Sequence, residues 1–351
     1  MFENANKLNP LSQLGEFGLI GELEKAFPTT QAGIVMGIGD DAAVFEKDTE
    51  NYWLLSTDML VEGIHFDLVY TPLKHLGYKA IVSNVSDIAA MNGIPKAVTV
   101  SLAMSSKYTI EATEALYEGI QLACQKYGLD LVGGDTSSSK HGMMLSVSIV
   151  GEVSKNDIVY RNRAALSDLV VLTGDLGGAY VGLQILEREK SVFMANSGIQ
   201  PELEGYDYIL ERQLKPEART DIKKLLLELG IKPTSMIDVS DGLSSELHHL
   251  AKRSGVGFTI YEEKLPIDQL TYDTARLLNL DPTICALHGG EDYELLFTIP
   301  VTDFEKVKGN PSMSVIGYCS EAANGINLIT RGETAVVPIV AQGWNAFTLP
   351  Q

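Results

Sequence analysis

The chain has 351 residues, a length that favours two α/β domains over a single compact core. Acidic residues outnumber basic ones by 46 to 27, and the net charge of −19 argues against a nucleic-acid or anionic-membrane partner. No apolar run approaches the roughly 18 residues that span a bilayer, and residues 1–10 lack the pattern of a signal peptide, so a cytoplasmic protein is expected. The three cysteines are far apart and predict neither disulfides nor a zinc site.

Short β-branched and aromatic runs alternate with helical patterns in the first half of the chain. Strands are predicted at 34–38, 52–56, 96–104, 129–132 and 143–153. Helices are predicted at 75–92 and 110–127, and the second of these ends at Gly128. Because the composition turns polar between Ser154 and Ser167, a domain boundary is expected near residue 155, which gives domains of 1–155 and 156–351.

A second series of strands and helices is predicted after this boundary. The segments "DLVVLTGDLGGAYVGLQIL" and "SMIDVSDGLSSELHHLAKRSG" each indicate a strand that runs into a helix, and residues 326–329 pair with 335–339 in a final hairpin. The cluster Gly174, Gly177 and Gly178 could hold a phosphate at a helix N-terminus, but a tight turn is the simpler interpretation. The predicted fold class is therefore α/β (α+β), with two domains.

The segment "GIGDDAAV" at 37–44 has the spacing of a dinucleotide-binding loop, G-x-G-x-x-A. That loop must open a helix, whereas this sequence continues as a strand, a turn and another strand. Asp40 and Asp41 also stand where the pyrophosphate would lie, so a dinucleotide site is excluded. The sequence contains neither G-x-S-x-G nor G-x-x-x-x-G-K-[ST], and therefore indicates neither an α/β-hydrolase nor a P-loop enzyme.

Several aspartates share one context, a strand end or loop rich in Gly, Ser or Thr, and one more lies on a predicted helix. They are Asp40, Asp41, Asp58, Asp135, Asp238 and Asp241, with Asp87 on the helix. Ligands gather at the carboxyl ends of strands in α/β sheets, so these side chains could converge on one site. Carboxylates and the hydroxyls of Ser56, Thr57 and Ser240 are oxygen ligands suited to Mg²⁺ or Mn²⁺, and magnesium usually arrives with phosphates.

Each of these residues alone also has a structural explanation. Asp241 could cap the following helix, and Asp41 could bond its own loop. Asp41 is set aside because only one residue of an adjacent pair is expected to face the site. His65 alternates with apolar neighbours on a predicted strand, which is equally compatible with a structural role and a substrate contact. Arg161 is suited to forked contacts with phosphate.

Six segments together carry a specific resemblance. "GIGDDAAV", "LLSTDMLVEGIHF", "NVSDIAAMNG", "LVGGDTSS", "MIDVSDGL" and "HGGEDYELLF" resemble thiamine-monophosphate kinases in order and spacing, from about residue 12 to the C-terminus. The resemblance implies the two-domain architecture shared with aminoimidazole ribonucleotide synthetase, and a homodimer whose N-terminal domains pair. It also implies an ATP-dependent phosphorylation of thiamine monophosphate to thiamine diphosphate.

The resemblance further implies a set of site residues. The metal ligands would be Asp40, Ser56, Thr57, Asp58, Asp87, Asp135, Asp238 and Asp241, holding several Mg²⁺ ions. The nucleotide contacts would be Tyr117, Gly134, Asp135, Arg161 and Ser240. The contacts to thiamine monophosphate would be His65, Glu291 and Trp344, with a core-sealing role of Trp344 as the alternative. The family often reads "DHF" after this aromatic residue, whereas this chain has Asn345, Ala346 and Phe347.

The chemistry implied by this family needs no protein base. The acceptor is a phosphate monoester with a second pKa of about 6, so it is mostly a dianion at pH 7. Metal ions and Arg161 would bring the two polyanions together for direct in-line transfer without a phosphoenzyme. Alternatives are aminoimidazole ribonucleotide synthetase, a selenide-phosphorylating enzyme, disfavoured because no cysteine lies near an N-terminal glycine-rich segment, and a Mg-nucleotide-binding module without turnover.

Overall fold

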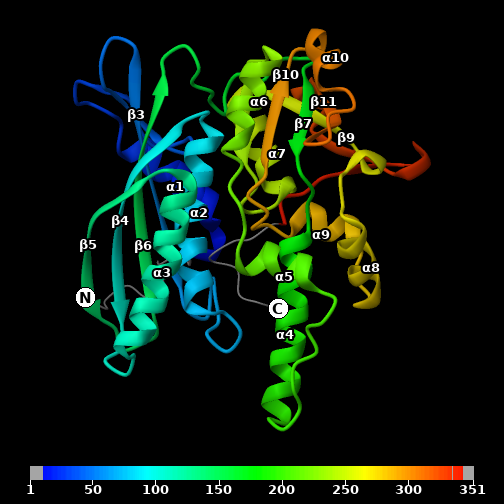
Figure 1. The fold of residues 1–351 in the computed structure, drawn as a ribbon. Coiled ribbons are helices and arrows are strands. Elements are labelled where there is room, and N and C mark those ends of the chain that lie inside the picture. Colours follow the sequence, from blue (N-terminus) through cyan, green and yellow to red (C-terminus); the bar gives the residue numbers. More distant parts are fainter. Residues whose placement is uncertain (1–10, 334, 343–351) are drawn as a thin grey trace, which may run out of the picture.

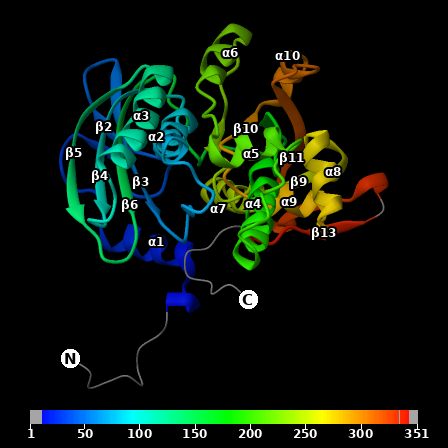
Figure 2. The same ribbon diagram turned by 60° about the horizontal axis from the view of Figure 1, so that its bottom comes forward.

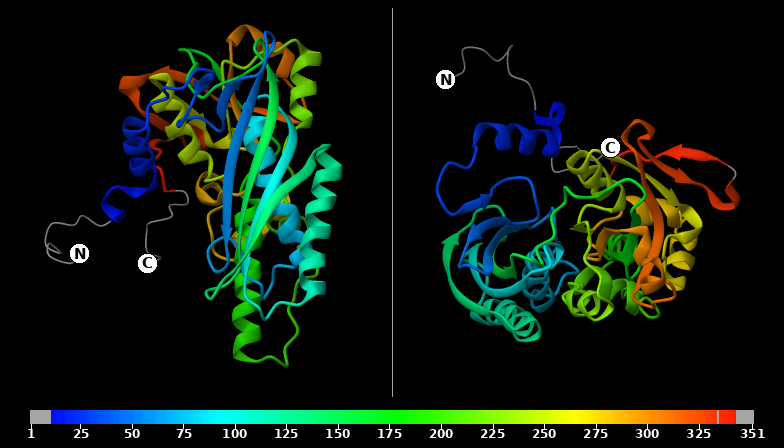
Figure 3. Two further views of the ribbon diagram at one scale, coloured as in Figure 1. Left: turned by 90° about the vertical axis from the view of Figure 1, so that its left-hand side faces the viewer. Right: turned by 90° about the horizontal axis from the view of Figure 1, so that it is seen from above.

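The computed structural model describes residues 11–333 and 335–342 and places them around two separate β-sheets (Figure 1). The first sheet is built from residues 34–154 and the second from residues 169–338. The connection between them, residues 155–168, carries no helix or strand. Figure 3, seen from above in its right panel, shows the two halves of the chain side by side. This mixture of helices and sheets confirms the predicted fold class, while the division into domains at residue 155 stays a prediction.

The first sheet has six strands in the order β1-β2-β3-β6-β4-β5. Its strands are β1 (Ile34–Met36), β2 (Ala43–Glu46), β3 (Asn51–Val61), β4 (Ile94–Met104), β5 (Asp130–Ser138) and β6 (Met144–Ser154). All pairs are antiparallel except β4 with β5. Two long helices, α2 (Leu73–Ala90) and α3 (Ile110–Tyr127), pack against this sheet. The outer strand β5 is exposed along its whole length.

The helices α2 and α3 cross at a contact that only glycine permits. A Cβ atom at Gly77 of α2 would lie 2.0 Å from the Leu116 carbonyl oxygen, and one at Gly119 of α3 would lie 1.8 Å from the Lys74 carbonyl oxygen. Both distances are far inside van der Waals contact, so the two helix backbones touch directly. The crossing therefore fixes the position of α2 between the sheet and the rest of the molecule.

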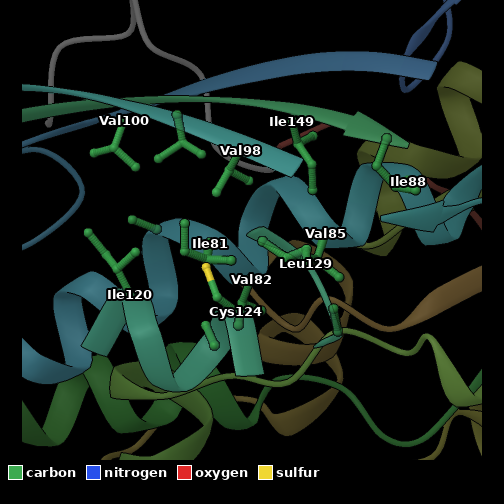
Figure 4. Packing of buried hydrophobic residues seen from close by; sticks show 14 of the residues in the cluster. Ile81, Val82, Val85, Ile88, Val98, Val100, Ile120, Cys124, Leu129 and Ile149 are labelled. Carbon is green, nitrogen blue, oxygen red and sulfur yellow. The ribbon is translucent and has the colours of Figure 1, made fainter. Parts of the chain in front are cut away.

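Apolar side chains of both helices and the sheet form the core of the first half (Figure 4). Ile81, Val85 and Ile88 of α2 recur at helical spacing and point toward Val98 and Ile149 of the sheet. The opposite face of α2 carries Ser83, Ser86 and Asp87. These three residues lie toward the second half of the chain.

The second sheet has the strand order β13-β12-β9-β11-β7-β10-β8. Its strands are β7 (Leu169–Thr173), β8 (Ser235–Asp238), β9 (Val256–Tyr261), β10 (Leu295–Ile299), β11 (Met313–Glu321), β12 (Ile326–Ile329) and β13 (Val336–Pro338). The accompanying helices are α4 (Gly178–Ala195), α5 (Asp207–Leu214), α6 (Asp221–Leu229), α7 (Leu243–Ser254), α8 (Gln269–Leu277), α9 (Pro282–His288) and α10 (Phe304–Val307). None of the helices in the described part of the chain is both long and apolar enough to cross a bilayer.

The two halves hold each other through polar contacts as well as through packing. The Glu217 carboxylate accepts hydrogen bonds from the hydroxyls of Tyr78 at 2.8 Å and Tyr127 at 2.6 Å. The first helix, α1 (Gly15–Ala26), reaches across to α7, where Arg253 forms two hydrogen bonds with Glu24 at 2.7 and 2.9 Å (Figure 2). The N-terminal helix is thus attached to the second half of the molecule.

Two local predictions differ from the structure. The predicted strand around His65 is wrong, because β3 ends at Val61 and the chain then turns so that the His65 Nδ1 atom accepts a hydrogen bond from the Val61 amide. The strand predicted at 129–132 continues through "GGDTSS", which places Asp135 inside β5 rather than after it. By contrast, the helix at 110–127 has the predicted ends, with Thr109 as its cap and Gly128 in the left-handed conformation.

Candidate active site

Three carboxylates from three separate elements converge between the two sheets. Asp41 lies in the loop between β1 and β2, Asp87 lies on α2, and Asp238 is the last residue of β8. Their oxygen atoms all lie within 4.8 Å of one another, a spacing at which one metal ion could be shared. We call Asp41, Asp87 and Asp238 the cleft cluster. The convergence of a helix, a strand end and a loop produces a binding arrangement that no single segment contains.

Serine hydroxyls support two members of the cleft cluster. Ser56 lies on β3 and donates a hydrogen bond to Asp87 Oδ2. Ser86, one residue before Asp87, donates to Asp238 Oδ2 at 2.7 Å and so links α2 to β8. Asp241 does not act as a helix cap, since α7 begins after Gly242 without a side-chain cap. Its carboxylate lines the same cavity as Asp58, which leaves it available for the site.

Burial makes the ionised form of these carboxylates costly. It raises the pKa of Asp238 to about 8, with the nearby charge of Asp41 as a further cause. Burial and the charge of Asp41 likewise raise the pKa of Asp40 to about 7. The pKa of Asp87 is also well above its ordinary value, through burial and then the charge of Asp58. Such a group of carboxylates retains protons near neutral pH unless cations replace them.

Arg161 is the side chain that faces the loop carrying Asp40 and Asp41. Its guanidinium forms a forked contact with the Asp41 carboxylate, with Nε at 3.1 Å from Oδ2 and Nη2 bonded to Oδ1. Its backbone amide donates to Asp40 Oδ2 at 3.1 Å. The sequence analysis set Asp41 aside as a loop residue, but here Asp40 makes the bond within the loop, to the Asp41 amide. The structure therefore gives Asp41 the more central place.

A cavity of about 890 Å³ adjoins the cleft cluster and is lined by both halves of the chain. Among the predicted site residues, its lining includes Thr57, Asp58, His65, Asp87, Asp238, Ser240, Asp241 and Glu291. The Thr57 hydroxyl itself bonds the Val147 carbonyl oxygen and the Ser148 hydroxyl. Burial lowers the pKa of His65, so its imidazole is neutral at pH 7. The cavity thus places a polar wall beside a group of potential metal ligands.

Contacts between the two halves border this cavity. The Tyr70 hydroxyl donates to Glu187 of α4 at 2.8 Å, and Lys190 of α4 pairs with Asp67 at 2.7 Å. All four residues belong to the cavity lining. Access to the cavity is therefore shaped by polar contacts that join the two halves.

Glu291 has a partner that the sequence analysis missed. The buried Lys79 of α2 places its ammonium 2.8 Å from Glu291 Oε1, although the two residues come from different halves of the chain. A lysine inside the otherwise buried run "GYKAIV" was a signal that could have been noticed, because lysine is almost never buried without a partner. The pair puts a compensated charge at one wall of the cavity.

Three predicted nucleotide contacts lie elsewhere in the chain. Tyr117, Gly134 and Asp135 line a second depression, of about 380 Å³, at the edge formed by β5 and α3. Asp135 pairs with Ser101 of β4, which lies beyond β6 as seen from β3, so roughly 14 Å of sheet separates β5 from β3. Within the described residues, Asp135 is not among the carboxylates of the cleft cluster. The predicted substrate contact Trp344 lies outside the described residues.

Comparison with known proteins gives this arrangement a family. The profile of the AIR synthase related protein, N-terminal domain, matches residues 39–153. The thiamine-monophosphate kinase of Bacillus subtilis (strain 168) is 34% identical over 343 residues, covering 95% of this chain and 100% of the relative. The thiamine-monophosphate kinase of Aquifex aeolicus (strain VF5) is 36% identical over 340 residues, covering 96% and 99%.

A solved structure agrees over a similar extent. The structure described as AaThiL complexed with AMPPCP and TMP superposes with a TM-score of 0.83 at 34% identity, covering 97% of this chain and 100% of that chain. The fold and the matching profile together define an AIR synthase-related protein. Within that class, the chain belongs to the thiamine-monophosphate kinase family and is a kinase. The resemblance inferred from the six segments is confirmed.

Proposed function

We propose that this kinase transfers the γ-phosphoryl group of ATP to thiamine monophosphate, giving thiamine diphosphate and ADP. The observation that carries the proposal is the cleft cluster, because its three carboxylates adjoin a cavity large enough for a small substrate. The names of the relatives and the AMPPCP and TMP of the solved complex support the choice of substrates. The predicted cytoplasmic location belongs to the same proposal.

The cleft residues fit Mg²⁺, because their donor atoms are carboxylate and hydroxyl oxygens. We assign Asp40, Ser56, Asp58, Asp87, Asp238 and Asp241 as candidate ligands and add Asp41 to this set. Several bound Mg²⁺ ions would supply charge neutralisation for the phosphates of both substrates. The raised pKa values of the cleft carboxylates make proton release part of metal binding.

The remaining groups orient the reaction rather than move protons. The acceptor phosphate is mostly a dianion above its second pKa of about 6, so no side chain is assigned as a base. We assign Arg161, together with Ser240, to the nucleotide phosphates, because its guanidinium lies beside the 40–41 loop that carries candidate metal ligands. The proposal includes direct in-line transfer without a phosphoenzyme, and a labelled protein trapped after incubation with γ-labelled ATP would contradict it.

The substrate side of the proposal uses the polar wall of the cavity. His65 and Glu291 lie among the lining residues together with the aromatic side chains of Tyr70 and Tyr180. A flat, cationic substrate such as thiamine monophosphate can stack on aromatic rings and bond a carboxylate. Trp344, outside the described residues, stays a predicted stacking contact.

A homodimer is the second part of the proposal. The edge strand β5 is exposed, and the apolar side chains Leu131 and Val132 are 41% and 64% accessible on it. Pairing of two such edges would cover these side chains and the depression formed by Tyr117, Gly134 and Asp135. A role of Asp135 in metal and nucleotide binding then requires either a second copy of the chain or a movement of this edge.

The test is release of ADP with ATP and Mg²⁺ in the presence of thiamine monophosphate, thiamine or an aminoimidazole precursor. Turnover with thiamine monophosphate alone, abolished by Asp238→Asn, supports the proposal. Turnover with another acceptor would be compatible with the proposed metal site but would refute thiamine monophosphate as the substrate. Binding of Mg-ATP without any product would favour a nucleotide-binding module instead.

A further inference from the structure

A buried glutamine lies next to the proposed substrate wall. Gln213 of α5 is only 5% accessible, yet it is among the residues that line the main cavity. Its side-chain amide donates to Glu291 Oε2 at 2.9 Å, and its backbone carbonyl oxygen accepts from Lys79 Nζ at 3.2 Å. Lys79 also holds Glu291 Oε1 at 2.8 Å. Glu291 is thus held on both oxygens, by Lys79 on one side and by Gln213 on the other.

The oxygen atom of the Gln213 side-chain amide has no hydrogen-bond partner among the described residues. This atom, Oε1, is also buried. Rotating the amide would direct this oxygen at the Glu291 carboxylate, so the contact with Glu291 fixes which way the amide points. A buried acceptor without a donor costs free energy, and the protein carries that cost beside a cavity. Such an oxygen is suited to a donor that a ligand brings.

The backbone around Glu291 is fixed by its conformation and by hydrogen bonds. The backbone of Glu291 is left-handed, with a φ of 57°, and Tyr293 follows with a φ of 53°. The amide of Glu291 donates to the Ser240 carbonyl oxygen at 2.7 Å, and the Asp292 carboxylate accepts from the Gly177 amide at 2.9 Å. Side chains rarely adopt this backbone conformation unless the surroundings impose it. The loop therefore presents the Glu291 carboxylate at a fixed place.

We propose that Gln213 is a specificity-determining residue, whose Oε1 atom together with the Glu291 carboxylate accepts hydrogen bonds from an exocyclic amine on a flat heteroaromatic ring. This inference rests on the proposed function, in which that ring is the aminopyrimidine of thiamine monophosphate. Two adjacent acceptors favour a donor of two protons, as an amine is, and disfavour a carbonyl or phosphate oxygen. Lys79 is a positioning residue that pairs with Glu291 Oε1, so Glu291 serves as an acceptor rather than as the counter-charge of the thiazolium.

The experiment compares thiamine monophosphate with its oxo analogue, in which a carbonyl replaces the amine. Binding of both to the full chain is measured by calorimetry with an ATP analogue and Mg²⁺ present, beside steady-state kinetics. The wild-type protein is expected to prefer the amine by about 100-fold, because the oxo analogue leaves the buried acceptor without a donor. Gln213→Met is expected to reduce this preference to less than about 10-fold and to raise KM for thiamine monophosphate about 10-fold, with KM for ATP and kcat unchanged.

Matched variants separate this role from a structural one. Gln269→Met removes an exposed glutamine that also bonds a carboxylate, Asp273, and should change neither preference nor KM. Gln213→Asn, which withdraws the amide by one methylene, gives the same test if Gln213→Met does not fold. Lys79→Met should raise KM for thiamine monophosphate with kcat retained, and adding Glu291→Gln should recover the lost melting temperature, since no unpaired charge then remains.

The outcomes are distinct from those of the proposed function. Equal binding of the two compounds by the wild-type protein, or full preference for the amine in both Gln213 variants, overturns the inference even if turnover is normal. Failure to bind either compound overturns it as well. Preferential binding that depends on Gln213, without any turnover, would support the inference while refuting the kinase reaction with this substrate.

Discussion

Two groups of acidic side chains inside this molecule differ in how their negative charge is compensated. In the cleft cluster, Asp41, Asp87 and Asp238 face one another, and Arg161 contacts Asp41. In the second half of the chain, Asp292 and Glu294 are buried as well, but they are paired with arginines. We call Asp292, Glu294, Arg212 and Arg219 the arginine cluster.

The arginine cluster satisfies its charges internally. Arg212 bonds Glu294 Oε1 at 2.9 Å, and Arg219 bonds Glu294 Oε2 at 2.7 Å. The Thr173 hydroxyl adds a further bond to Glu294 at 2.6 Å. Because Asp292 and Glu294 follow Glu291 in the chain, these ion pairs also anchor the segment that carries Glu291. The comparison teaches that this protein can neutralise buried acids with its own arginines, and that it leaves the cleft cluster short of positive charge.

The largest expected effect comes from Asp238→Asn. Loss of a central carboxylate should lower kcat by at least about 1,000-fold, comparable with the loss of one strong transition-state interaction. The metal-free protein should be no less stable, because the amide replaces a buried carboxyl group whose ionised form is costly. Steady-state kinetics and thermal melting check the two statements, with the exposed Asp157→Asn as control. A fall in stability equal to that of an arginine-cluster variant would contradict the comparison.

Arg212→Met is expected to have its main effect on stability, in contrast to Asp238→Asn. It leaves Asp292 and Glu294 without their shared partner, and breaking a buried ion pair costs about 3 to 5 kcal/mol of unfolding free energy. Urea unfolding measures the loss, and added Mg²⁺ should not restore it. Exposed Arg276→Met serves as the control. Recovery of stability by Mg²⁺ would show that the two clusters are not as different as the structure indicates.

The pH dependence of stability should also distinguish the clusters. Burial raises the pKa of Asp238 from an ordinary value of 3.8 to about 8, so the native state holds a proton that the unfolded chain releases. The metal-free protein should therefore lose stability as the pH rises from about 4 to 8. Because Mg²⁺ replaces protons, its stabilising effect should grow over the upper part of this range. Melting temperatures with and without Mg²⁺ at pH 6 and pH 8.5 test this, and an equal Mg²⁺ effect at both would refute it.

Asp135→Asn is expected to give the smallest change at the cleft cluster. Since β5 lies roughly 14 Å across the sheet from β3, the stabilisation of the chain by Mg²⁺ alone should persist. KM for ATP should rise about 10-fold, because Asp135 shares its depression with Tyr117. Sedimentation at several protein concentrations shows whether the effect depends on a dimer. Loss of all Mg²⁺ stabilisation in this variant would place Asp135 among the direct ligands of the same ions.

Local signals in the sequence predicted the elements and much of the site. Helix α3 has its predicted ends because Thr109 and Gly128 act within one turn of the helix. The aspartates at strand ends predicted a shared site because sheet topology brings such ends together. The choice between Asp40 and Asp41 was not accessible in this way, since it depends on Arg161, 120 residues further along the chain. The partners of Glu291 on α2 and α5 were likewise hidden, because they arise from packing between the two halves.

The close crossing of α2 and α3 at Gly77 and Gly119 has a consequence for mutations far from the active site. Asp87 lies on the same rigid helix as Gly77, so any side chain at position 119 pushes α2 along or away from the sheet and carries Asp87 with it. A substitution on α3, in contact with neither phosphate nor metal, would then behave in a genetic screen as a loss of catalysis. The helix crossing is therefore part of what determines the geometry of the active site.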